Sequence, residues 1–311
     1  MPTIITRGAM SAYAMSFGTT ALKNLMAIFG YGNDVSDVTN VTNLVSTTGV
    51  VATNTTGVGT ARKYLAAAGY GTGKAIFGYG IGVGAELSMT NLVSNVGVVA
   101  ADTTGVGTER YGLAAAGYGK DKAIFGYGYV APNVLSMTNL VSNTGVVSTD
   151  TAGVGTARRY LAPAGYGADK AIFGYGLNGS SAVVSMTNLV SNTGVVSTDT
   201  TGVGTARTDL AAAGYGIDKA IFGYGSTGST TNLTNLVSNT GVVSTDTAGV
   251  GTSRSDLAAA VYGTDKAIFG YGFSFGSYKS MTNLVSNTGV VATDTTGVGT
   301  ARYGLAASSY G

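Results

Sequence analysis

The chain has 311 residues, of which 50 are glycine and only 10% are charged. Its formal net charge is +2, and no run of lysine or arginine exceeds the pair Arg158-Arg159, so the composition gives no electrostatic case for binding nucleic acid. The absence of cysteine and histidine excludes disulfides, thiolate or imidazole metal sites, and Ser-His-Asp or Cys-His catalysis.

The N-terminal segment, residues 1–25, is irregular compared with the rest of the chain. It lacks a basic region followed by an apolar stretch, so we expect no secretory signal. No part of the sequence has the roughly 20 uninterrupted apolar residues of a membrane span. We expect this segment to cap the domain or to serve as an attachment arm. Within it, Ser11–Gly18 is a candidate for one additional inner strand.

From residue 26 onwards, one unit of about 48 residues recurs six times. The motif Ile-Phe-Gly-Tyr-Gly places its phenylalanine at Phe29, Phe77, Phe125, Phe173, Phe222 and Phe269. The motifs Gly-Thr-x-Arg and Thr-Asn-Leu-Val-Ser recur six times in the same phase. Three markers in one phase identify the chain as a repeat protein.

Each unit is predicted to form four strands, taken here from the second copy. The first covers residues 65–71, the second 74–80, the third 89–94 and the fourth 98–100. A short turn at 72–73 joins the first two, and a glycine-containing turn at 95–97 joins the last two. A loop that differs from copy to copy connects the second strand to the third.

The distribution of side-chain sizes within the unit favours a radial all-β fold. The first strand is rich in alanine and glycine, which suits the crowded centre of a β-propeller, whereas Ile, Phe and Tyr of the second strand suit the wider space between blades. We therefore predict a six-bladed β-propeller of four-stranded repeats. Seven blades and a β-solenoid are the alternatives. Residues 26–311 are predicted to form one domain, closed when residues 302–311 enter the blade of the strand at 27–31.

The unit resembles the kelch repeat in the order Thr-Ala-Arg, Leu-Ala-Ala-Ala-Gly-Tyr, a short turn, and Lys-Ala-Ile-Phe-Gly-Tyr-Gly. The resemblance extends over roughly residues 7–311, and the array is also similar to kelch-like arrays in phage proteins. It is divergent, because the family's Gly-Gly doublet is replaced by Gly78-Tyr79-Gly80, Leu or Val replaces the third-strand Tyr, and the chain has no tryptophan for the fourth strand. The resemblance implies that the loops between the second and third strands, and those entering the first, share one ligand-binding face.

The two regions of the unit that differ between copies fall in those same two loops. Near-identical scaffold segments thus alternate with divergent loops, which is where binding residues usually lie. Aromatic residues there suit stacking on sugar rings or anchoring a protein, although a small hydrophobic cluster beneath the loops is an equal alternative. The binding candidates are Glu86, Tyr129, Arg159, Tyr160, Phe273, Phe275, Tyr278 and Lys279.

An arginine occupies one position in every unit, and two roles are open to it. Six arginines could bind anions on one face, or each could lock neighbouring blades by bonding carbonyls or stacking on tyrosine; we favour the structural role. Most aspartates also recur at fixed positions, which indicates turn residues rather than catalytic ones. The six arginines are Arg62, Arg110, Arg158, Arg207, Arg254 and Arg302.

These observations predict a binding or structural protein that is not an enzyme and needs no metal or cofactor. Its expected partner is a cell-surface glycan or a protein, and it is expected to bind no nucleic acid. A component of a virion or of its appendage is one setting for such a module. An intracellular protein–protein interaction scaffold is the alternative, and a glycan-active enzyme is less favoured.

Overall fold

The computed structural model describes residues 24–311, which contain strands, turns and loops but no helix. Six antiparallel sheets of three strands each account for most of the strands. In order from the inner to the outer strand they are β20(Ala306–Tyr310)-β1(Met26–Gly30)-β2(Thr42–Val45), β3(Ala66–Tyr70)-β4(Lys74–Gly78)-β5(Thr90–Val93), β6(Ala114–Tyr118)-β7(Lys122–Val130)-β8(Asn133–Val141), β10(Ala162–Tyr166)-β11(Lys170–Gly174)-β13(Thr187–Val190), β14(Ala211–Tyr215)-β15(Lys219–Gly223)-β16(Thr234–Val237) and β17(Ala258–Tyr262)-β18(Lys266–Ser274)-β19(Ser277–Val285). A two-stranded sheet, β9(Arg158–Arg159)-β12(Leu177–Asn178), joins two loops.

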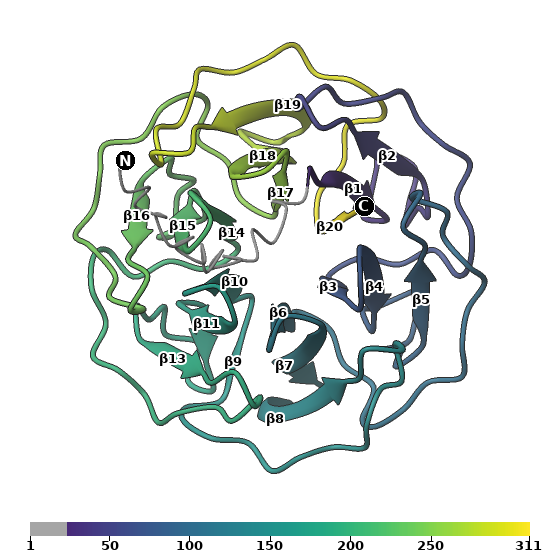
Figure 1. Cartoon of the computed structure of the whole chain (residues 1–311), viewed down its shortest axis with the longest axis vertical. Coiled ribbons are helices and arrows are strands. Elements are labelled where there is room, and N and C mark those ends of the chain that lie inside the picture. The colour runs from purple at the N-terminus through teal and green to yellow at the C-terminus, as the bar shows by residue number, and fades with distance from the viewer. Residues whose placement is uncertain (1–23) are drawn as a thin grey trace, which may run out of the picture.

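The sheets follow one another in chain order around a common centre (Figure 1). The inner strands consist mostly of small residues, as in Ala66–Tyr70, and the Ile-Phe strands lie outside them. The C-terminal strand β20 pairs with β1 over five residue pairs, from Met26↔Tyr310 to Gly30↔Ala306. The first sheet therefore combines strands from both ends of the described chain.

The fourth strand expected in each unit is reduced to isolated contacts. In the second unit only Val93↔Val99 and Thr90↔Thr103 form bridges. Between them the side chain of Asn91 donates to the carbonyl of Ala100 at 3.0 Å, so a side chain takes the place of a main-chain donor. The candidate inner strand at 11–18 lies outside the described residues.

The hydrophobic core lies between neighbouring sheets. Phe125 of β7 is fully buried, and its ring lies 5.1 Å from that of Tyr79 in an edge-on arrangement. It also covers Gly78 of the preceding sheet, where an added Cβ would come within 2.7 Å of the Phe125 ring. The glycine of Ile-Phe-Gly-Tyr-Gly therefore leaves room for the phenylalanine of the next sheet, which explains why the motif recurs intact.

Each repeat arginine is buried in a joint between two sheets. The guanidinium of Arg110 lies 4.3 Å from the ring centre of Tyr79 and donates to Asn139 Oδ1 at 2.6 Å. The carboxylate of Asp150 lies 3.9 Å from Arg110 and accepts hydrogen bonds from Thr108. All six repeat arginines have no exposed surface, so they do not line a face of the molecule.

One joint lacks the carboxylate. In the first unit Asn54 occupies the position equivalent to Asp150. Its side chain donates a hydrogen bond to the hydroxyl of Thr300 and accepts one from the Thr300 amide, two residues before the buried Arg302. Arg302 Nη2 and Asn43 Oδ1 are buried without hydrogen-bond partners. The joint around Arg302, between the β17–β18–β19 sheet and the β20–β1–β2 sheet, is therefore less well satisfied than the joint around Arg110.

We expect Asn54→Asp to stabilise the protein, because it would supply the missing carboxylate beside Arg302. After allowance for solvent screening, the expected gain is about 0.5–1 kcal/mol in the free energy of unfolding. Urea denaturation of the two proteins measures it, and the reverse change Asp150→Asn, expected to destabilise, is the matched control. A loss of stability in Asn54→Asp would contradict this account of the joint.

Candidate functional site

A closed ring of main-chain hydrogen bonds surrounds the centre on the variable-loop side. Six residues form this axial ring, each two positions after a repeat arginine, and each adopts a positive φ between 53° and 62°. Each amide donates to the carbonyl of the preceding member at 2.7–3.0 Å, and the amide of Tyr64 closes the ring onto Gly304. The members are Tyr64, Gly112, Tyr160, Asp209, Asp256 and Gly304.

The axial ring encloses a cavity of about 80 Å³, lined by its six members and by the leucine that follows each. The rings of Tyr64 and Tyr160 stand 5.2 Å apart at an interplanar angle of 67°. They lean over the two glycines of the axial ring, since a Cβ at Gly112 would lie 3.0 Å from Tyr160 and one at Gly304 would lie 3.1 Å from Tyr64. Asp209 and Asp256 form the other wall of the cavity.

These two carboxyl groups are neighbours, and each perturbs the ionisation of the other. Burial raises the pKa of both, and the negative charge of Asp256 raises the pKa of Asp209 further. Ser255 Oγ donates to Asp256 at 2.8 Å. Burial, and then the charge of Asp256, also raises the pKa of the Tyr64 phenol, which keeps it a neutral hydrogen-bond donor.

Aromatic side chains extend outward from the axial ring on one side. Tyr64 contacts Tyr111, which contacts Tyr129 on the long β7–β8 hairpin, with ring centres 6.1 and 5.4 Å apart. The guanidinium of Arg159 lies 4.4 Å from the ring centre of Tyr129 and 5.6 Å from that of Tyr160. These half-buried residues form one continuous series of contacting rings with a cation among them.

A second aromatic group lies on the other side, on the long β18–β19 hairpin. Tyr303 stacks on Tyr278 at 5.3 Å and contacts Phe273 at 5.9 Å. Tyr303 also lies 6.0 Å from Tyr64, so the two groups meet at the axial ring. Lys63 lies over the rings of Tyr64 and Tyr303 and donates to Asn33 Oδ1 at 3.2 Å.

The structure thus brings together five of the eight predicted binding residues and leaves three apart. Tyr129, Arg159 and Tyr160 belong to the first aromatic group, and Phe273 and Tyr278 to the second. Phe275 is 86% exposed at the hairpin tip, and Lys279 donates to Ser277 at 2.7 Å. Glu86 pairs only with Ile81 within its own loop.

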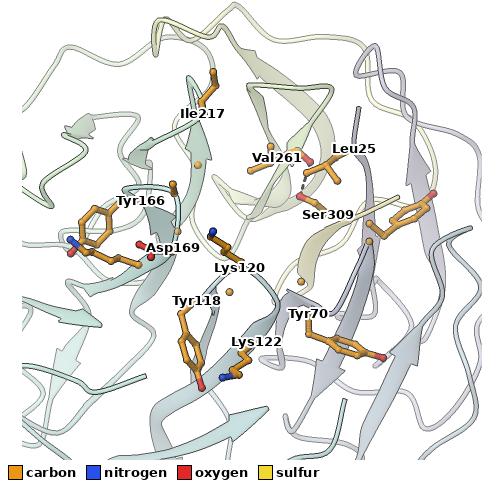
Figure 2. Close-up of a pocket in the computed structure, with 18 of the residues that line it drawn as sticks. Leu25, Tyr70, Tyr118, Lys120, Lys122, Tyr166, Asp169, Ile217, Val261 and Ser309 are labelled. Atoms are coloured by element: carbon orange, nitrogen blue, oxygen red, sulfur yellow. Dashed lines mark hydrogen bonds between the residues drawn. The ribbon is translucent and has the colours of Figure 1, made fainter. Parts of the chain in front are cut away.

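The opposite mouth of the central opening has a different character. Its cavity, about 390 Å³, is lined mainly by residues that recur in every unit, including the tyrosines and lysines at the inner hairpins. Figure 2 shows Tyr70, Tyr118 and Tyr166 directed away from the opening, so their rings do not form a platform in it. In the same view Ser309 Oγ of β20 donates to the carbonyl of Val261 of β17 at 2.8 Å. Sequence variation therefore concentrates at the axial-ring mouth.

The carboxyl pair is the part of the site that the sequence interpretation missed: Asp209 and Asp256 lie in the variable segment that enters the first strand, but they were not among the predicted binding residues. A signal was present: Asp209 and Asp256 occupy one position in consecutive units, where the other units have tyrosine or glycine. Consecutive units place equivalent residues side by side around the centre. An acidic pair in two adjacent copies thus indicates adjacent carboxyl groups.

No family model and no curated protein sequence matches this chain. Within residues 24–311 we find no helix of the length and apolarity that crossing a membrane requires.

Proposed function

We propose that residues 26–311 form a six-bladed, kelch-like β-propeller closed by the C-terminal strand. The six three-stranded sheets around one centre support this assignment, as does the pairing of β20 with β1. The axial ring supports it further, because six amides and six carbonyls satisfy one another only if six units meet around an axis. The β-solenoid alternative offers no reason for such a ring.

We further propose that this protein is a non-enzymatic module that binds glycans through the variable-loop face. The observation that carries the proposal is the continuous aromatic surface built from residues that break the repeat, including Tyr129 and Tyr278. Aromatic faces stack on the apolar faces of sugar rings, and the neighbouring phenol and carboxyl groups suit sugar hydroxyls. Both long hairpins contribute to this surface, so a ligand longer than one sugar has contacts on either side of the axial ring.

A glycan array followed by calorimetry with the best binder tests this proposal. We expect Tyr129→Ala or Tyr278→Ala to weaken binding about tenfold, which corresponds to the loss of one stacked ring. Ile217→Ala is the matched control, because Ile217 is exposed at the opposite mouth. An array without any binder, or binding unaffected by both tyrosine changes, would contradict glycan recognition and would favour a protein partner.

A further inference from the structure

The cavity inside the axial ring is acidic and has no internal counterion. Asp209 and Asp256 are the only charged residues that line it. Neither forms a salt bridge with a lysine or arginine among residues 24–311. The two nearest cations, Lys63 and Arg159, lie over the tyrosine rings, and neither lines the cavity. Adjacent buried carboxyl groups without a cation are costly unless something else compensates their charge.

The remaining walls also suit a cation. The faces of tyrosine rings attract positive charge, and Tyr64 and Tyr160 enclose the cavity at a steep angle to one another. The buried hydroxyl of Thr208 lies close to the Asp209 carboxyl group and favours its ionised form, which is the form that attracts a cation.

We propose that this cavity binds the protonated amino group of an unacetylated amino sugar. The inference rests on the proposed glycan-binding function and specifies its ligand. The ammonium group would enter the cavity beside the carboxyl pair, with the sugar ring against Tyr111, Tyr129 and Tyr303. An N-acetyl group would carry no charge to the carboxyl pair and would place a larger, neutral amide against it.

Binding is coupled to proton release in this arrangement. Burial favours the protonated form of both carboxyl groups, whereas an entering ammonium group favours their ionised form, so binding releases protons to the buffer at any pH where the free pair is partly protonated. Because the pKa values of both carboxyls are raised, lowering the pH protonates the pair and weakens binding. Lys63 and Arg159 oppose this protonation, whereas burial among Tyr64, Tyr160 and the leucines favours it.

Calorimetry with three trisaccharides of matched length tests the proposal: one of glucosamine, one of N-acetylglucosamine and one of glucose. We expect the glucosamine trisaccharide to bind about tenfold or more tightly than the other two. Proton release makes the measured binding enthalpy differ between two buffers of unlike ionisation enthalpy. Asp209→Asn and Asp256→Asn are each expected to remove both this difference and the preference for the glucosamine trisaccharide. Asp169→Asn, which removes a charge from the opposite mouth, is the matched control and should change neither.

Each other outcome counts against the proposal in a distinct way. Equal binding of the three trisaccharides would overturn the ammonium site while leaving glycan recognition intact. Binding of none of them, together with a silent glycan array, would overturn both. Binding of Nα-acetyl-lysine amide, which keeps a charged ε-amino group, without any sugar binding would assign the cavity to a protein lysine instead, provided that the binding depends on Asp209. Thermal melting of each variant shows whether it folds, and a variant that does not fold is replaced by Asp209→Gly, because glycine occupies the equivalent positive-φ position at Gly112 and Gly304.

Discussion

Removal of residues 302–311 is expected to abolish the folded state. The deletion takes away β20, which supplies five residue pairs to β1, and Arg302, which is buried in the joint between this sheet and the β17–β18–β19 sheet. It also removes the contacts of Ser309 with Val261 and of Gly311 with Gly73. The edge of β1 would then be exposed, and a free edge strand pairs readily with other chains. We expect no cooperative thermal transition and aggregation on size-exclusion chromatography with light scattering.

Deletion of residues 1–20 is the control, and it is expected to leave a stable monomer. If this deletion were the one to collapse the fold, the closing strand would have to come from the other end of the chain. The comparison therefore tests which terminus completes the first sheet.

Phe125→Ala is expected to lower the free energy of unfolding by about 3–5 kcal/mol. The side chain is fully buried, it contacts Tyr79, and it fills the space above Gly78, so its removal would leave a cavity between two sheets. Phe275→Ala makes the same chemical change at a residue that is 86% exposed and should stay within about 0.5 kcal/mol of the parent protein. Chemical denaturation of both variants measures the difference. Equal effects at the two positions would contradict the proposed packing between sheets.

Much of the architecture is predictable from the sequence because the repeat supplies the same evidence six times. The strands around Ala66–Tyr70, Lys74–Gly78 and Thr90–Val93 lie within one or two residues of their predicted ends. The fourth strand was predicted from the glycine-containing turn at 95–97 that precedes it. The prediction did not take into account that Asn91 donates to the main chain at Ala100 and so replaces a ladder bond.

The candidate site was less predictable, because it depends on which units become neighbours in space. The variable loops identified Tyr129, Arg159, Tyr160, Phe273 and Tyr278, which lie in two aromatic groups. Nothing in a linear sequence joins those groups: they meet through Tyr64 and Tyr303, which come from opposite ends of the repeat array. The charge of the cavity likewise follows from the proximity of two aspartates 47 residues apart, Asp209 and Asp256.

The axial ring is made entirely by main-chain atoms, and this has a consequence for how the module can diversify. Since no side chain is needed to close the ring, its main-chain hydrogen bonds can persist when a member changes identity. Their positive φ values limit the choice, because glycine, asparagine and aspartate adopt that conformation most readily. Two pairs of positions are also coupled, since a Cβ at Gly112 would lie 3.0 Å from Tyr160 and one at Gly304 would lie 3.1 Å from Tyr64. A combinatorial library at residues 64, 112, 160, 209, 256 and 304 that varies each pair together would explore new ligands on one scaffold.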